Sequence, residues 1–87
     1  GIVTEIKKIP EENLFIRTYV KDMTSKAFGM QVYDLNHNLI DDIEMPPFFK
    51  LLGHYKGFLY GITMIPKETD EATLFTLYKI RITKTVV

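Results

Sequence analysis

Apolar and polar residues alternate with a period of two through most of this 87-residue chain. The alternation is clearest in the segments 14–21 and 73–83, which are rich in β-branched and aromatic residues. Successive side chains of a strand point to opposite faces, so this period is typical of strands that bury one face more than the other. We find no segment with a convincing helical period. The sequence therefore predicts an all-β fold.

The stretch 28–45 predicts two strands joined by a tight turn. Its first arm, 28–34, alternates by two, and a cluster of Asp, Asn and His residues follows at 34–38. Asn and Asp tolerate left-handed backbone angles and bond to nearby backbone amides, so this cluster predicts a turn. The acidic residues of the return arm, 39–45, predict an exposed edge strand. Two prolines at 46–47 end it, because proline cannot donate to a ladder.

The other predicted strands are short alternating segments separated by polar turns that contain glycine or proline. The first of them alternates with one step out of register. These strands are 2–9, 14–21, 48–52, 58–65 and 73–83, with turns at 10–13, 22–26, 53–57 and 66–72.

A shift of 45 positions brings the first half of the chain onto the second. It aligns apolar strand positions and polar loops without a gap in 14–35. A period near 40–50 residues in an all-β chain is typical of propeller blades, each a four-stranded antiparallel sheet. We therefore predict two consecutive propeller-type repeats of about 45 residues, 2–46 with four strands and 47–87 with three. Chance similarity between alternating strands is the alternative explanation. Among the aligned pairs are Ile6 with Leu51, Leu14 with Leu59, Thr18 with Thr63, Met30 with Phe75, Val32 with Leu77, Tyr33 with Tyr78 and Leu35 with Ile80.

Three short runs also resemble a known family. The sequence VYDLN at 32–36, followed by NLI at 38–40, is similar to the strand–turn–strand of bacterial six-bladed β-propellers of the TolB-like and NHL-like kind. The sequence GFLYG at 57–61 is similar to one of their strands. His37 departs from the family, in which such a turn commonly has glycine. The resemblance implies a propeller fold, a location in the cell envelope, periplasmic or exported, and a non-enzymatic role. No functional residue carries over.

Composition narrows the classes of partner. Eleven basic residues balance eleven acidic ones, whereas nucleic acids and anionic membranes require a basic surface. No apolar run approaches the ~20 residues that span a bilayer. We therefore expect neither a nucleic-acid partner nor membrane insertion by this segment. The chain has no cysteine, which excludes disulfides and thiolate sites. It begins at Gly1 without methionine, so we expect a processed product or an excised piece.

Catalytic and metal-binding patterns are absent from the sequence. The two histidines, His37 and His54, lie in predicted turns and lack a third ligand at short spacing. Asp41 and Asp42 are neighbours on a strand and point to opposite faces, so they cannot act together as acid and base. The hydroxyl side chains have no histidine partner at a recognisable spacing. We predict that the chain is not an enzyme and binds no metal or cofactor.

Aromatic residues interleaved with basic ones form the candidate interaction surface. Such residues can stack on sugars or on single-stranded nucleic acid. The more ordinary explanation is packing between blades. The candidate residues are Arg17, Tyr19, Lys21, Phe48, Phe49 and Tyr60.

Two functional hypotheses follow. The first is a segment of a β-propeller that acts as a scaffold or as a binding and interaction module. The second is a self-contained small antiparallel barrel that binds an oligosaccharide or oligonucleotide on an aromatic face. In the first case two terminal blade faces lack cover, and terminal repeats normally need a polar outer face. We therefore predict a homo-oligomer, a dimer before a closed ring, or association with the remainder of a longer propeller chain.

Overall fold

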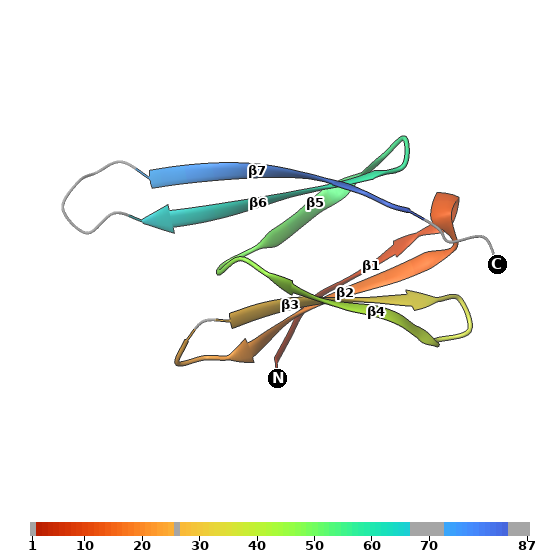
Figure 1. Cartoon of the computed structure of the whole chain (residues 1–87), viewed down its shortest axis with the longest axis horizontal. Coiled ribbons are helices and arrows are strands. Elements are labelled where there is room, and N and C mark those ends of the chain that lie inside the picture. The colour runs from red at the N-terminus through yellow and green to blue at the C-terminus, as the bar shows by residue number, and fades with distance from the viewer. Residues whose placement is uncertain (1, 26, 67–72, 84–87) are drawn as a thin grey trace.

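The computed structural model describes residues 2–25, 27–66 and 73–83, and the side chains within those ranges except at 65, 66, 73 and 74. It contains two antiparallel sheets and a single 3-10 turn, η1 (Pro10–Glu12) (Figure 1). The all-β prediction is confirmed. One sheet contains β1 (Ile2–Ile9), β2 (Leu14–Asp22), β3 (Ala27–Asp34) and β4 (Leu39–Met45), and the other contains β5 (Lys50–Tyr55), β6 (Phe58–Pro66) and β7 (Thr73–Arg81).

Each sheet is a meander in which strands that follow one another in sequence are neighbours in space. In Figure 1 the two sheets lie one above the other, and the chain passes from β4 to β5 between them. Within the described residues no ladder joins one sheet to the other, so the predicted alternative of a single closed barrel is wrong. β4 is an edge strand, as its acidic residues predict.

The first two strands of each sheet share their register beside the turn that joins them. Lys8 pairs with Phe15 in the four-stranded sheet, and Gly53 pairs with Tyr60 in the other, so both partners are displaced by the predicted shift. Beside that turn the internal similarity is structural as well as sequential.

Both ladders also contain a one-residue bulge in their first strand, near Thr4 and near Leu52, at positions that the shift does not align. The bulge in β1 is the step out of register that the sequence indicates. Beyond the second bulge the registers differ by one residue, so the predicted equivalence of Ile6 with Leu51 is wrong: Ile6 is exposed, whereas Leu51 is buried.

The third strand of the second sheet departs from the shift by one residue. Val32 pairs with Ile16, but the residue that pairs with Gly61 is Tyr78 and not Leu77. The predicted equivalences of Val32 with Leu77 and of Met30 with Phe75 are therefore wrong. A slip of one residue exchanges the two faces of a strand. Met30 is buried in the core, whereas Phe75, its predicted equivalent, lies on the outer face of β7 and is exposed.

The core lies between the two sheets. Each sheet contributes one face, so the apolar residues at alternate positions of its strands meet those of the other sheet. The ring of Phe49, from the segment that links β4 to β5, lies directly over Gly61, where a side chain would collide with it. The buried members of this core are Ile9, Ile16, Met30, Met45, Phe49, Leu51 and Leu59.

The turn between β3 and β4 is built around Asp34. Its Oδ1 accepts the backbone N–H groups of Asn36 and Asn38, each at 2.9 Å, and these bonds fold the chain back on itself. His37 has a φ of 67°, the left-handed conformation for which propeller turns commonly use glycine. The backbone hydrogen bond from Asn38 is the main reason why the pKa of Asp34 lies below its ordinary value. The turn predicted from the polar cluster is confirmed.

The turn between β5 and β6 is shorter than predicted. Only Lys56 and Gly57 lie between the strands, with φ values of 48° and 82°. Two successive positive φ values are what a two-residue hairpin turn requires. Gly53 and His54 therefore belong to β5 and not to a turn, which also removes His54 from the solvated position that the sequence suggests.

Candidate functional site

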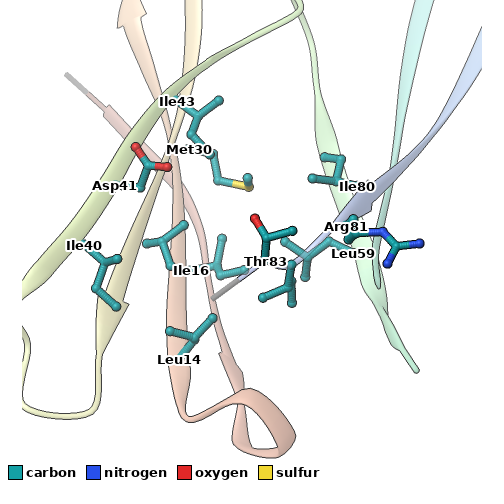
Figure 2. Close-up of a pocket in the computed structure, with 12 residues that line it drawn as sticks. Leu14, Ile16, Met30, Ile40, Asp41, Ile43, Leu59, Ile80, Arg81 and Thr83 are labelled. Atoms are coloured by element: carbon teal, nitrogen blue, oxygen red, sulfur yellow. The ribbon is translucent and has the colours of Figure 1, made fainter. Parts of the chain in front are cut away.

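A cleft of about 600 Å³ lies between the two sheets. Figure 2 shows that side chains from both sheets point into it. A volume of this size is in the range of sites for small organic ligands, roughly 300–1,000 Å³. The four-stranded sheet contributes Leu14, Ile16, Met30, Val32, Ile40, Asp41 and Ile43, and the other side contributes Leu59, Ile80, Arg81, Ile82 and Thr83.

The described lining of the cleft is mainly apolar and contains no aromatic ring. Its polar members are Asp41, Arg81 and Thr83. Figure 2 shows the hydroxyl of Thr83 pointing into the cleft, whereas the guanidinium of Arg81 extends away from it. That guanidinium lies 5.0 Å from the ring centroid of Phe58, on the outer face of the three-stranded sheet. Among the described residues of the lining, Asp41 is therefore the charged group that remains at the cleft.

Asp41 reaches the cleft because of the pairing of β4. It pairs with Val32, a residue of the inner face, whereas Asp42 pairs with Gln31 on the outer face. The predicted separation of the two carboxylates onto opposite faces is confirmed. A register irregularity beside Ile40 precedes Asp41, and the backbone N–H of Asp42 donates to Asp41 Oδ1 at 2.9 Å. This bond fixes the carboxylate near the strand.

None of the described lining comes from β1 or β5, which approach each other away from the cleft. There, Lys7 Nζ of β1 donates to the backbone carbonyl of Leu52 in β5 at 3.3 Å. His54 of β5 also approaches the turn after β1, with Nδ1 3.6 Å from Glu11 Oε2 and Nε2 3.5 Å from Glu12 Oε1. The His54 side chain is only 9% exposed. These polar contacts join β1 to β5.

A second, smaller hollow of about 320 Å³ lies on the outer face of the four-stranded sheet. Its lining combines rings with a cation: Phe15 stacks on His37 at 5.5 Å between centroids, and Arg17 lies 5.5 Å from the ring centroid of Tyr33. Ile6 completes it. The hollow is the part of the chain that best fits the predicted aromatic and basic surface.

A hydrogen-bond network continues from this hollow across β2, β3 and β4. Gln31 Oε1 accepts from Arg17 Nε and from the Tyr33 hydroxyl, each at 2.9 Å. Gln31 Nε2 donates to Asp42 Oδ2 at 3.3 Å, and the Tyr19 hydroxyl donates to Asp42 Oδ1 at 2.7 Å. This last bond is the main reason why the pKa of Asp42 lies below its ordinary value and that of Tyr19 above it.

The six residues of the predicted interaction surface do not form one surface. Arg17, Tyr19 and Lys21 share the outer face of β2, and the first two belong to the network just described. Tyr60 lies on the outer face of the other sheet, since its neighbours Leu59 and Gly61 are buried.

The two phenylalanines at 48–49 differ from the prediction as well. Phe49 is buried in the core, so its inclusion in an interaction surface is wrong. Phe48 is partly exposed, and its ring lies 5.8 Å from that of Phe28. The sequence gives no sign of the cleft, because its lining consists of ordinary strand residues such as Ile80 and Val32.

Two further findings concern other kinds of site. In residues 2–25, 27–66 and 73–83 no three His, Cys, Asp or Glu side chains are grouped so that they could hold a metal ion. In the same residues no helix has the length and apolar character needed to cross a membrane.

Comparison with family models, with curated proteins and with solved structures gives no match for this chain. The resemblance to TolB-like and NHL-like propellers therefore stays a prediction.

Proposed function

We propose that this chain is a non-enzymatic binding module in which two consecutive propeller-like blades hold a slender aliphatic ligand with a cationic end. The observation that carries this proposal is the cleft of about 600 Å³ lined from both sheets. Most small-molecule sites are concave and largely apolar, with a few polar groups that orient the ligand.

The lining selects the shape and chemistry of the ligand. Leucine, isoleucine, valine and methionine side chains offer apolar contact without a ring on which a sugar or a base could stack. An alkyl chain is the complement of such a wall, since burying each CH₂ group contributes about 0.8 kcal/mol. We therefore assign the interior of the cleft to an aliphatic chain.

The charge at the cleft selects the end of the ligand. The Asp41 carboxylate borders the cleft, while the Arg81 cation is held over Phe58 on the far face. A cationic end can pair with Asp41, whereas an anionic end would meet an uncompensated negative charge. The hydroxyl of Thr83 adds a neutral hydrogen-bonding group on the other wall.

A titration followed by nuclear magnetic resonance tests this assignment with two probes of equal chain length, octylammonium and octanoate. We expect octylammonium to shift the methyl signals of Ile16, Ile43 and Ile80 in a saturable way, and octanoate to bind at least about tenfold more weakly. In D41N the two probes should bind alike. Shifts confined to the exposed side chains of β7, or no saturation, would contradict the proposal.

Two neighbouring residues of β4 provide a matched pair of variants. Ile40 lines the cleft and Leu39 does not, and their exposed fractions are similar, 56% and 53%. I40W should block the cleft and weaken octylammonium binding, whereas L39W should leave it unchanged. Equal effects of the two variants would mean that the probe binds elsewhere.

The propeller architecture and the cell-envelope location belong to the same proposal. Two meanders whose first ladders share a register displaced by 45 residues beside the joining turn support consecutive blades. The location rests on the resemblance of 32–40 and 57–61 to envelope propellers. Fractionation of cells that produce the full parent protein tests it, and recovery in the cytosolic fraction would overturn it.

A second candidate function is favoured by the hollow on the outer face of the four-stranded sheet. Phe15, His37 and Tyr33 supply rings there, and Arg17 supplies hydrogen-bond donors. This arrangement suits an oligosaccharide, which stacks on rings and bonds to polar side chains. Titration with maltohexaose should then shift the Phe15 and Tyr33 ring signals, and F15A should abolish the shifts. A titration that leaves both rings unchanged would eliminate this candidate.

A further inference from the structure

Two strand edges are open on the same side of the molecule. β4 ends the four-stranded sheet and β7 ends the three-stranded sheet, and no described strand pairs with the outer edge of either. Residues of both strands line the cleft, whereas none of its described lining comes from β1 or β5, which the hydrogen bond from Lys7 to Leu52 joins. An open edge presents unpaired backbone N–H and C=O groups, which makes it a template for another strand.

Comparison of the two sheets shows that, among the described residues, β7 lacks the neighbouring strand that β3 has in β4. In the four-stranded sheet β4 lies beside β3 and supplies Asp42 to the network of the outer face. β7 is the counterpart of β3, and among the described residues nothing occupies the position beside it. Its outward residues Phe75 and Leu77 are accordingly 61% and 73% exposed.

The charges of the two edges are complementary. β4 carries Asp41, Asp42 and Glu44, of which the last two lie on the outer face. β7 carries Lys79 and Arg81 on its outer face, and the strand itself contains no Asp or Glu. Opposite charges on neighbouring strands stabilise their pairing, and like charges oppose it. The basic side chains of β7 therefore favour an acidic neighbouring strand, and β4 is such a strand.

We propose that β7 of one copy pairs with β4 of a second copy, and that β4 of the first pairs with β7 of the second. Because both edges lie on one side of the chain, a single two-fold axis can generate the two contacts, as in an isologous dimer. Each layer of the dimer would be one continuous sheet made of the three-stranded sheet of one copy and the four-stranded sheet of the other. This inference rests on edges and charges and does not depend on the proposed ligand.

Charge reversal combined with analytical ultracentrifugation tests the pairing. We expect the unaltered chain to form a dimer at micromolar concentration. K79E/R81E, which makes the edge of β7 acidic, and E44K, which reduces the acidity of β4, should each weaken association at least about tenfold. An equimolar mixture of these two variants should recover association in part, because one contact of the mixed dimer again joins an acidic β4 to a basic β7, and the other joins an acidic β7 to a β4 whose outer face is neutral.

The control variant K50E/K56E changes the net charge of the same sheet equally, at β5 and its turn instead of at β7. It should dimerise like the unaltered chain. Circular dichroism shows whether each variant folds, and recovery in the mixture is itself evidence that both do. A monomeric unaltered chain overturns the proposal. So does a dimer that E44K leaves intact, which would indicate pairing of β7 with β7.

Discussion

The outward faces of the two sheets differ in how their side chains are satisfied. On the four-stranded sheet, Arg17, Gln31 and Asp42 are linked by hydrogen bonds that cross three strands. On the three-stranded sheet, Lys79 lies 4.2 Å from the ring centroid of Phe58, and Phe75 and Leu77 project into solvent. The first face is polar and internally bonded. The second is apolar and basic.

The difference follows from the fourth strand. Asp42 of β4 accepts hydrogen bonds from both Tyr19 and Gln31, so the network depends on this residue. The described part of the three-stranded sheet has no counterpart of Asp42. Terminal repeats of stacked proteins normally carry a polar outer face. The outer face of the four-stranded sheet is polar in this way. That of the three-stranded sheet is not.

The largest expected effect is a loss of stability from core substitutions, and it tests whether the two sheets differ only on their outer faces. Ile16 and Leu59 lie in the core on opposite sheets, and both are almost fully buried. I16A and L59A should each lower the free energy of unfolding by about 2–5 kcal/mol, because a cavity remains where the side chain is removed. Denaturant unfolding followed by circular dichroism should keep a single transition in both variants.

Separate transitions would change this comparison. If L59A lost less than about 1 kcal/mol and unfolded in a step of its own, the two sheets would be independent units and not halves of one core. The exposed F75A serves as the control, and its effect should be within about 0.5 kcal/mol.

A smaller effect on stability is expected when one glycine on each sheet is replaced. A side chain at Gly61 would collide with the ring of Phe49, which is buried, and one at Gly29 would meet the far end of Tyr19. The Tyr19 ring lies at the surface and can swing away, but Phe49 cannot. G61A should therefore destabilise the chain by about 1–3 kcal/mol, and G29A by less. The midpoints of denaturant unfolding measure both, and the reverse order would contradict the packing described.

The features that the sequence predicts well are those determined by local chemistry. The period of two identifies the strands, and the acidic residues of 39–45 identify an edge. The turn at Asp34 follows from a short carboxylate that can accept nearby amide groups, and it does so in the structure. Such features depend on residues close in sequence, so one chain suffices to infer them.

The features that the sequence misses depend on contacts between distant residues. β7 has apolar residues on both faces, as Leu77 and Tyr78 illustrate, so the period cannot show that its register differs by one from that of β3. Phe49 is buried because it covers Gly61 from another strand. The cleft arises from how the two sheets diverge, and no residue type marks that angle. These properties belong to the packing of the sheets.

The smallest expected effect concerns acid, and it should separate the two sheets once more. Among the described residues, the carboxyl groups with lowered pKa values are Asp22, Asp34 and Asp42, which belong to the four-stranded sheet and its turns. A carboxyl group whose pKa is lower in the folded state stabilises that state above its unfolded pKa, about 3.9 for Asp. This contribution is lost as the pH falls through the lower, folded value. The turn at 56–57 involves no carboxyl group.

Hydrogen exchange at two amides measures this contrast. The Asn38 N–H donates to Asp34 Oδ1, whereas the Ile82 N–H donates to the backbone carbonyl of Gly57 at 3.0 Å. Between about pH 6 and about pH 3, protection of Asn38 should fall relative to its intrinsic exchange rate, because protonated Asp34 is a weaker acceptor. Protection of Ile82 should change less over the same range, since neither of its partners titrates. In D34N the pH dependence at Asn38 should disappear while Ile82 is unaffected. Equal loss at both amides in the unaltered chain would mean that acid unfolds the two sheets together, and that their chemical difference does not extend to their local stability.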